Sequence, residues 1–130
     1  MSSASIASGS HDVDAPRIAR RFVTSTLATW GIAGTVVEHA QLLVSELVSN
    51  AVMHGGGPVV LRVIERDRGA RVRIEVADGG NGLPRMRRAA PQDVSGRGLR
   101  LVDELANGWG SSNVGGATSV WFEVQADASV

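Results

Sequence analysis

The chain has 130 residues, with 13 basic and 13 acidic residues, no cysteine and a formal net charge of zero. This length fits one domain with an ordinary core, and the balanced charge argues against nucleic-acid binding driven by bulk electrostatics. All 13 basic residues are arginine, which excludes the lysine-dependent P-loop, conventional protein kinase and Schiff-base chemistries. No apolar run approaches the roughly 20 residues of a membrane span. The N-terminus also lacks the pattern of a signal peptide, so we expect a cytoplasmic protein that contacts neither membrane nor nucleic acid directly.

Composition divides the chain into three parts. Residues 1–13 are small and polar, which predicts a disordered N-terminal tail. Periodic apolar residues occupy 14–125, the expected folded domain, and 126–130 form a short C-terminal tail.

Two helices are expected at the start of the domain. Asp14 can cap the first, apolar residues follow at helical spacing, and Gly31 ends it. The second runs from Thr35 to about His54, where three glycines and a proline stop it.

The apolar period then changes from helix to strand. Val59–Arg66 and Ala70–Asp78 read as strands joined by a turn at Asp67-Arg68-Gly69. In the second strand, Arg and Glu alternate with Val and Ile. Asp78 has the parity of the apolar residues, so its carboxylate should point to the covered face of the sheet.

A long loop rich in Gly, Arg and Pro follows from Gly79 to Arg97 and leads to a short helix ending near Ala106. Trp109–Ser112 and Thr118–Val124 read as a closing hairpin. We therefore predict an α+β fold, a two-layer sandwich of a mixed or antiparallel sheet with its helices on one face.

Glu46 and Asn50 are the first candidate pair, because they lie one turn apart beside the apolar stripe of the second helix. An amide oxygen at Asn50 could ligate Mg²⁺, which keeps several of its waters. A carboxylate at Glu46 could orient or deprotonate a nucleophile. The alternative is that both residues are merely tolerated at the edge of a core helix.

Asp78-Gly79-Gly80-Asn81-Gly82 is the second candidate, at the end of a strand. An inward carboxylate at Asp78 could accept a hydrogen bond from an amine such as adenine N6, and Gly80 and Gly82 would let a flat base approach the backbone. The alternative is an ordinary glycine turn. The inward parity of Asp78 argues against that alternative, because an unpaired buried carboxylate is costly.

Gly96, Arg97, Gly98 and Leu99 open the short helix and could bind phosphate through free amides and one guanidinium. Thr118, inward at a strand start, could offer its hydroxyl to a phosphate. Each has an ordinary structural alternative, since a lone Gly-x-Gly is common and β-branched residues suit strands.

In this order, the motifs resemble the Bergerat-type ATP-binding fold of gyrase, heat-shock 90 chaperones, histidine kinases and MutL. Among these, the chain most resembles the small stand-alone anti-sigma-factor serine kinases and their actinobacterial relatives. The resemblance covers about Ala15–Val124 and is carried by four strings: Leu43–Gly55, Val76–Pro84, Gly96–Val102 and Gly116–Phe122.

The resemblance implies that ATP and Mg²⁺ are the cofactors. Asn50 would ligate Mg²⁺, Glu46 would be the catalytic carboxylate, and Asp78 would bind the adenine amine with Gly80 and Gly82 against the base. The loop from about Leu83 would be an ATP lid that ends in the phosphate-binding residues Gly96, Arg97, Gly98 and Leu99.

The function implied is that of an anti-sigma factor with serine/threonine protein kinase activity toward a small anti-anti-sigma partner, and possibly with a sigma factor as a second partner. The alternative is a non-enzymatic regulator whose partner affinity depends on nucleotide. Relatives of this kind often form homodimers, and the outward-facing Trp121 is a candidate contact.

Overall fold

The computed structural model describes residues 2–8, 13–54, 58–78, 105–114 and 117–125. Two helices and five strands make up these parts, together with a 3-10 turn at Asp67–Gly69. The elements are β1 Ser3–Ser8, α1 Ala15–Thr29, α2 Thr35–His54, β2 Val59–Arg66, β3 Arg71–Asp78, β4 Gly108–Val114 and β5 Ala117–Gln125.

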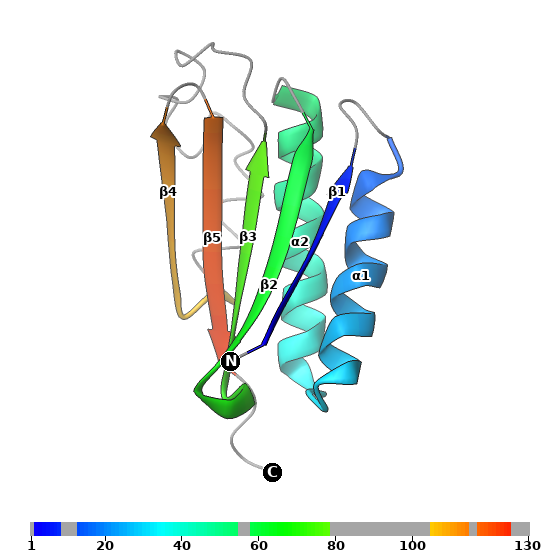
Figure 1. Cartoon of the computed structure of the whole chain (residues 1–130), viewed down its shortest axis with the longest axis vertical. Coiled ribbons are helices and arrows are strands. Elements are labelled where there is room, and N and C mark those ends of the chain that lie inside the picture. The colour runs from blue at the N-terminus through cyan, green and yellow to red at the C-terminus, as the bar shows by residue number, and fades with distance from the viewer. Residues whose placement is uncertain (1, 9–12, 55–57, 79–104, 115–116, 126–130) are drawn as a thin grey trace.

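The five strands form one sheet in the order β1-β2-β3-β5-β4, and every neighbouring pair is antiparallel. Figure 1 shows α1 and α2 side by side against one face of this sheet. The predicted α+β sandwich is therefore confirmed, and the described sheet is antiparallel rather than mixed. Among the described residues, no helix has the length and apolar character needed to cross a membrane.

The expectation of a disordered N-terminal tail is wrong for Ser3–Ser8, which form β1 and pair with β2 along their whole length. Ile6 packs against the core, and the side chains of Ser3 and Ser5 are exposed. The strand is attached mainly by backbone hydrogen bonds to β2, which do not depend on side-chain chemistry. The C-terminal tail 126–130 lies outside the described residues.

The first helix begins and ends where the sequence predicts. Asp14 is the N-cap residue, although its side chain makes no capping hydrogen bond and lies 3.7 Å from Arg17 instead. At the other end, Gly31 has a φ of +74°, and the Ile32 N–H donates to Leu27 O while the Gly31 N–H donates to Ala28 O. This is a Schellman motif, which needs the left-handed conformation that glycine adopts without strain.

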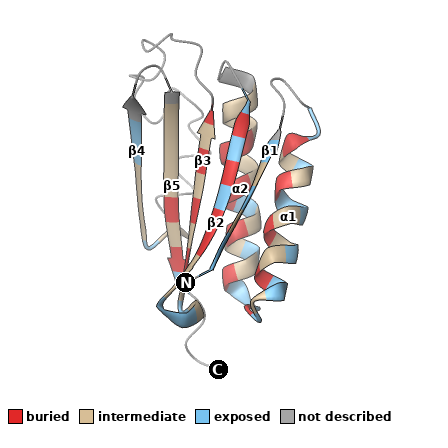
Figure 2. Ribbon diagram, viewed as in Figure 1, coloured by how far each residue is buried: buried red, intermediate tan, exposed pale blue. Residues whose placement is uncertain are grey.

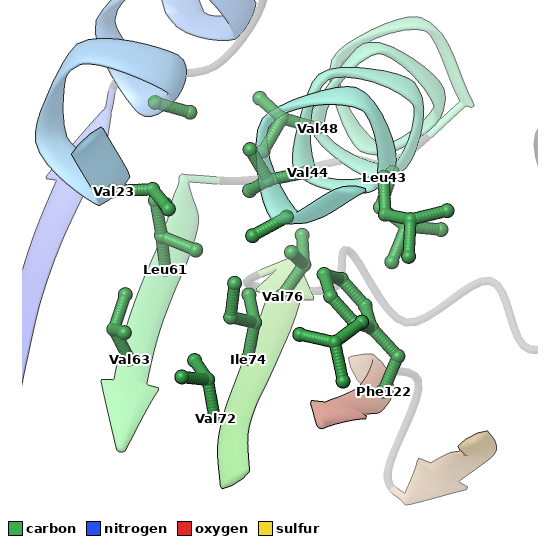
Figure 3. Packing of buried hydrophobic residues seen from close by; sticks show 14 of the residues in the cluster. Val23, Leu43, Val44, Val48, Leu61, Val63, Val72, Ile74, Val76 and Phe122 are labelled. Carbon is green, nitrogen blue, oxygen red and sulfur yellow. The ribbon is translucent and has the colours of Figure 1, made fainter. Parts of the chain in front are cut away.

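The core lies between the helices and the covered face of the sheet. Figure 3 shows Val44 and Val48 of α2 above Val76 of β3, with Leu43 on the side of Phe122 of β5. Burial alternates strictly along β3 from Arg71 to Asp78, as Figure 2 shows by colour. The sheet therefore has one apolar face and one polar face.

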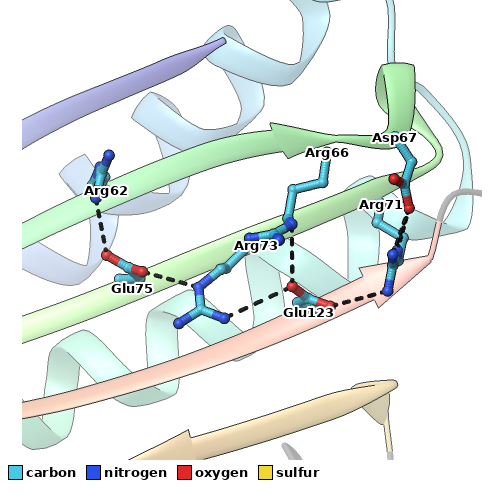
Figure 4. A network of polar contacts seen from close by, with 7 residues as sticks. All are labelled: Arg62, Arg66, Asp67, Arg71, Arg73, Glu75 and Glu123. Atoms are coloured by element: carbon cyan, nitrogen blue, oxygen red, sulfur yellow. Dashed lines mark hydrogen bonds and ion pairs between the residues drawn. The ribbon is translucent and has the colours of Figure 1, made fainter. Parts of the chain in front are cut away.

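The polar face carries a network of arginines and carboxylates (Figure 4). Glu123 of β5 lies within 3.6–3.8 Å of three arginines, Arg66, Arg71 and Arg73. Arg71 also contacts Asp67 at 2.6 Å, and this hydrogen bond raises the pKa of the guanidinium above its ordinary value. Arg73 in turn lies over the ring of Trp121, 4.1 Å from its centre, an arrangement typical of a cation–π contact.

Candidate nucleotide site

Glu46 and Asn50 lie on one flank of α2, and both are half-buried. The Nδ2 atom of Asn50 is fully buried and has no hydrogen-bond partner in the part of the chain that the structure describes. An unsatisfied buried amide costs roughly 1–3 kcal/mol. Asn50 is therefore not an ordinary core residue. This argues against the alternative that it is merely tolerated at the edge of a core helix.

Helix and strand geometry place Asn50 near the end of the sheet that carries Asp78. Leu43 lies on the Phe122 side of α2 (Figure 3), and Asn50 follows it by seven residues on nearly the same helix face. Two helical turns advance about 11 Å, and the four strand residues from Phe122 back to Thr118 span about 13 Å. Figure 1 shows that α2 ends at the same end of the molecule at which β3 ends and β5 begins.

Asp78 is the last residue of β3 and is the buried charged residue among those described, with 8% of its surface exposed. Its predicted inward orientation is confirmed. The backbone N–H of Thr118, forty residues later, donates to Asp78 Oδ1 at 3.3 Å. Two of the residues that the sequence singled out are thus in direct contact, because β3 and β5 are neighbours in the sheet.

This contact uses the backbone of Thr118, and the expectation that its hydroxyl binds a phosphate stays a prediction. The backbone amide, rather than the hydroxyl, holds the Asp78 carboxylate. A backbone N–H donor cannot be predicted from the residue type. The strand parity of Asp78 and Thr118 did predict that both face the covered side of the sheet. Asp78 has no arginine within ion-pair distance among the described residues, so its carboxylate retains acceptor capacity for a ligand.

The remaining predicted site residues lie outside the described part of the chain. They are Gly80, Gly82, Gly96, Arg97, Gly98 and Leu99, together with the expected lid. Their assignments remain predictions.

The described residues fit the chemistry of a magnesium nucleotide. Asn50 combines a hard amide oxygen with an unsatisfied Nδ2, which would gain an acceptor from a phosphate oxygen. Asp78 is a buried acceptor that matches an exocyclic amine. Among the described residues, no three His, Asp or Glu side chains cluster to hold a metal, and magnesium shared with phosphates does not need such a cluster.

The protein is an α+β sandwich in which α1 and α2 cover one face of the sheet. It has an acid–amide pair on α2 and a buried aspartate at the end of β3. These features define the class of Bergerat-type ATP-binding domains. The family model described as "Histidine kinase-like ATPase domain" matches residues 10–123. The chain therefore belongs to the histidine kinase-like ATPase domain family.

One solved structure extends this comparison to the fold. It is described as the crystal structure of the RsbU and RsbW domains of Rv1364c from Mycobacterium tuberculosis. The superposition has a TM-score of 0.72 and 20% sequence identity, and it covers 97% of this chain but only 33% of that one. This chain thus spans about a third of that solved chain and shares the fold of the part that it covers. Comparison with curated proteins gives no match.

Proposed function

We propose that this protein is an anti-sigma factor that binds ATP with Mg²⁺ and phosphorylates a serine or threonine of a small anti-anti-sigma partner. Membership of an ATPase-domain family supports the binding of ATP. The similar mycobacterial structure contains an RsbW domain, and the sequence resemblance to anti-sigma-factor kinases supports the proposed class of partner. A sigma factor is proposed as the second partner.

Two features near the same end of the sandwich carry the proposal, namely the buried Asp78 carboxylate and the unsatisfied amide of Asn50. The Asp78 carboxylate, held by the Thr118 amide, would accept a hydrogen bond from the adenine amine. Asn50 would contribute an oxygen to Mg²⁺, which when bound neutralises charge on the phosphates. Glycine and arginine residues outside the described part would complete the phosphate site.

Glu46, one turn before Asn50, is the proposed general base. Its carboxylate would accept the proton of the partner hydroxyl as that oxygen forms a bond to the γ-phosphorus. The bond from the γ-phosphorus to the bridging oxygen breaks, and ADP leaves with the electron pair. The protein would contribute mainly positioning of the hydroxyl and the phosphates, since no covalent enzyme intermediate is needed.

The test uses labelled ATP, Mg²⁺ and a candidate anti-anti-sigma protein. We expect Glu46→Ala to bind ATP as the parent does and to lose at least about 100-fold in transfer rate, the usual contribution of a general base. Glu38→Ala is the matched control, because Glu38 is an exposed acid in the first turn of the same helix. It should leave transfer unchanged.

Two outcomes would contradict parts of the proposal. Transfer by Glu46→Ala at the parental rate would remove Glu46 as the base. A parent protein that binds ATP but phosphorylates no candidate partner would favour the non-enzymatic regulator, in which nucleotide binding controls affinity for a protein.

A further inference from the structure

Leu42 is exposed on α2, although the two other leucines of this helix are buried. Its surface is 43% exposed, whereas Leu43 and Leu47 are 0% and 3% exposed. Among the described residues, the other exposed large apolar side chains are those of Val13, which precedes α1, and Val60, on the open face of β2. Single exposed apolar residues are common on protein surfaces, so the place of Leu42 on the helix decides whether it has a function.

Leu42 and Glu46 are neighbours on the side of α2 that faces away from the sheet. Val44 lies above the sheet (Figure 3), and Leu42 and Glu46 are each two residues from it, which at about 100° per residue is nearly the opposite side of the helix. Because they are four residues apart, Leu42 lies one turn before the proposed base. Asn50 follows one turn after Glu46. A line along α2 therefore leads from the exposed leucine past the proposed base to the proposed magnesium ligand.

This part of α2 is also turned away from α1. Gln41 and Ser45 of α2 each form a hydrogen bond with a side chain of α1, at 2.6 Å and 2.9 Å. Leu42 and Glu46 each follow one of these residues in the sequence, which places them about 100° further around the helix. Leu42 is therefore outside the contact between the helices, and truncating its side chain should leave their packing intact.

In the proposed transfer, the partner hydroxyl has to reach Glu46 from the outer side of α2. The proposed nucleotide would lie toward Asn50, and the core fills the space between the helix and the sheet. No described arginine lies within ion-pair distance of the Glu46 carboxylate. The segment of the partner that carries the hydroxyl would therefore pass over the exposed side chain of Leu42.

We propose that Leu42 determines substrate specificity, because it packs against an apolar side chain two positions from the acceptor serine or threonine of the partner. Four helical residues advance about 6 Å, and two residues of an extended segment span about 6.6–6.8 Å. In an extended segment, side chains two positions apart point to the same side. One of them can present its hydroxyl to Glu46 while the other covers Leu42. This inference rests on the proposed function and adds the kind of residue that its substrate carries.

The test is steady-state phosphorylation of the anti-anti-sigma protein used in the transfer assay. Leu42→Ala should raise the KM for this partner about fivefold to tenfold, because an apolar contact is lost on the exposed part of one leucine. It should leave kcat and the affinity for ATP unchanged, since the contact forms in the ground state and the transition state alike. Leu42→Met should restore the parental KM, because methionine keeps an apolar side chain of similar size.

Val60→Ala is the matched control. Val60 is exposed to nearly the same extent, 41%, but lies on the open face of the sheet. This variant should keep the parental KM. The melting temperature of Leu42→Ala should equal that of the parent, because the side chain is exposed and alanine favours the helix.

Changes in the partner identify the side chain that contacts Leu42. The residues two positions before and two positions after the acceptor are changed to alanine, one at a time. One of these changes should raise KM with the parent kinase and cause no further rise with Leu42→Ala, as expected for two residues in contact.

The outcomes separate this inference from the proposed function. If the parent phosphorylates the partner and Leu42→Ala has the same KM as Val60→Ala, the inference is wrong and the proposed function stands. A loss confined to kcat would also overturn it, as would additive losses at both partner positions. A parent that phosphorylates no partner would refute the kinase activity itself, and this inference would fail with it.

Discussion

Two carboxylates on neighbouring strands show how differently the two faces of this sheet treat charge. Glu123 of β5 points to the open face, where three arginines lie within 3.6–3.8 Å. Asp78 of β3 points to the covered face, where it is 8% exposed and accepts one backbone N–H at 3.3 Å. The charge of Glu123 is compensated inside the molecule, and that of Asp78 has no ion-pair partner among the described residues.

We propose that this difference separates a structural acid, Glu123, from a binding acid, Asp78. A buried carboxylate without a charged partner is unfavourable for folding, and in the proposed function Asp78 offsets this cost by binding the nucleotide.

Phe122 and Trp121 are consecutive on β5 and point to opposite faces of the sheet. Phe122 is completely buried in the core, and Phe122→Ala should lower the free energy of unfolding by about 3–5 kcal/mol because it leaves a cavity. Trp121 is half-buried under Arg73, and Trp121→Ala should lower it by clearly less. Urea denaturation measures both. A larger loss for Trp121→Ala would mean that the open face is covered in solution.

Gly110 of β4 lies under the ring of Trp121. A Cβ added there would be 2.7 Å from Trp121 Nε1, whereas one added at Gly108 would be 3.9 Å from the nearest ring atom. Gly110→Ala should therefore force the ring from Arg73 and lower the free energy of unfolding by about 1–3 kcal/mol. Gly108→Ala, the matched control, should be neutral or stabilise by up to about 1 kcal/mol. Equal effects in thermal melts would contradict this packing.

The arginine network around Glu123 should contribute little to stability. Its arginines are 24–42% exposed, and partly exposed ion pairs contribute roughly 0.2–1 kcal/mol each and weaken with salt. We expect Glu123→Gln to lower the free energy of unfolding by about 1 kcal/mol at low salt and by less at high salt, measured by urea denaturation. A large, salt-independent loss would show that Glu123 behaves as a buried charge.

The amino-acid pattern predicted most of this fold because side-chain periodicity reports burial. The alternation along β3 predicted the inward Asp78, and Gly31 marked the end of α1; both are confirmed. β1 was missed because Ser3–Ser8 is poor in β-branched residues and pairs through its backbone. The alternation of Ala4 and Ile6 with Ser3 and Ser5 was the available signal.

Part of the candidate nucleotide site could also be predicted from side-chain periodicity. Residue types and parity indicated Asn50 and Asp78, but the Thr118 amide that holds Asp78 is a backbone group with no sequence signature. Contacts between distant segments require the three-dimensional arrangement.

The central claim is that Asp78 is a ligand-binding acid and Glu123 a structural one. Calorimetric titration of the parent, Asp78→Asn and Glu123→Gln with MgATP tests it most directly. Asp78→Asn should weaken binding about 10- to 100-fold, the loss expected for one charged hydrogen bond, while remaining folded, and Glu123→Gln should bind like the parent. Parental affinity in Asp78→Asn, or no binding of MgATP by the parent, would contradict the account.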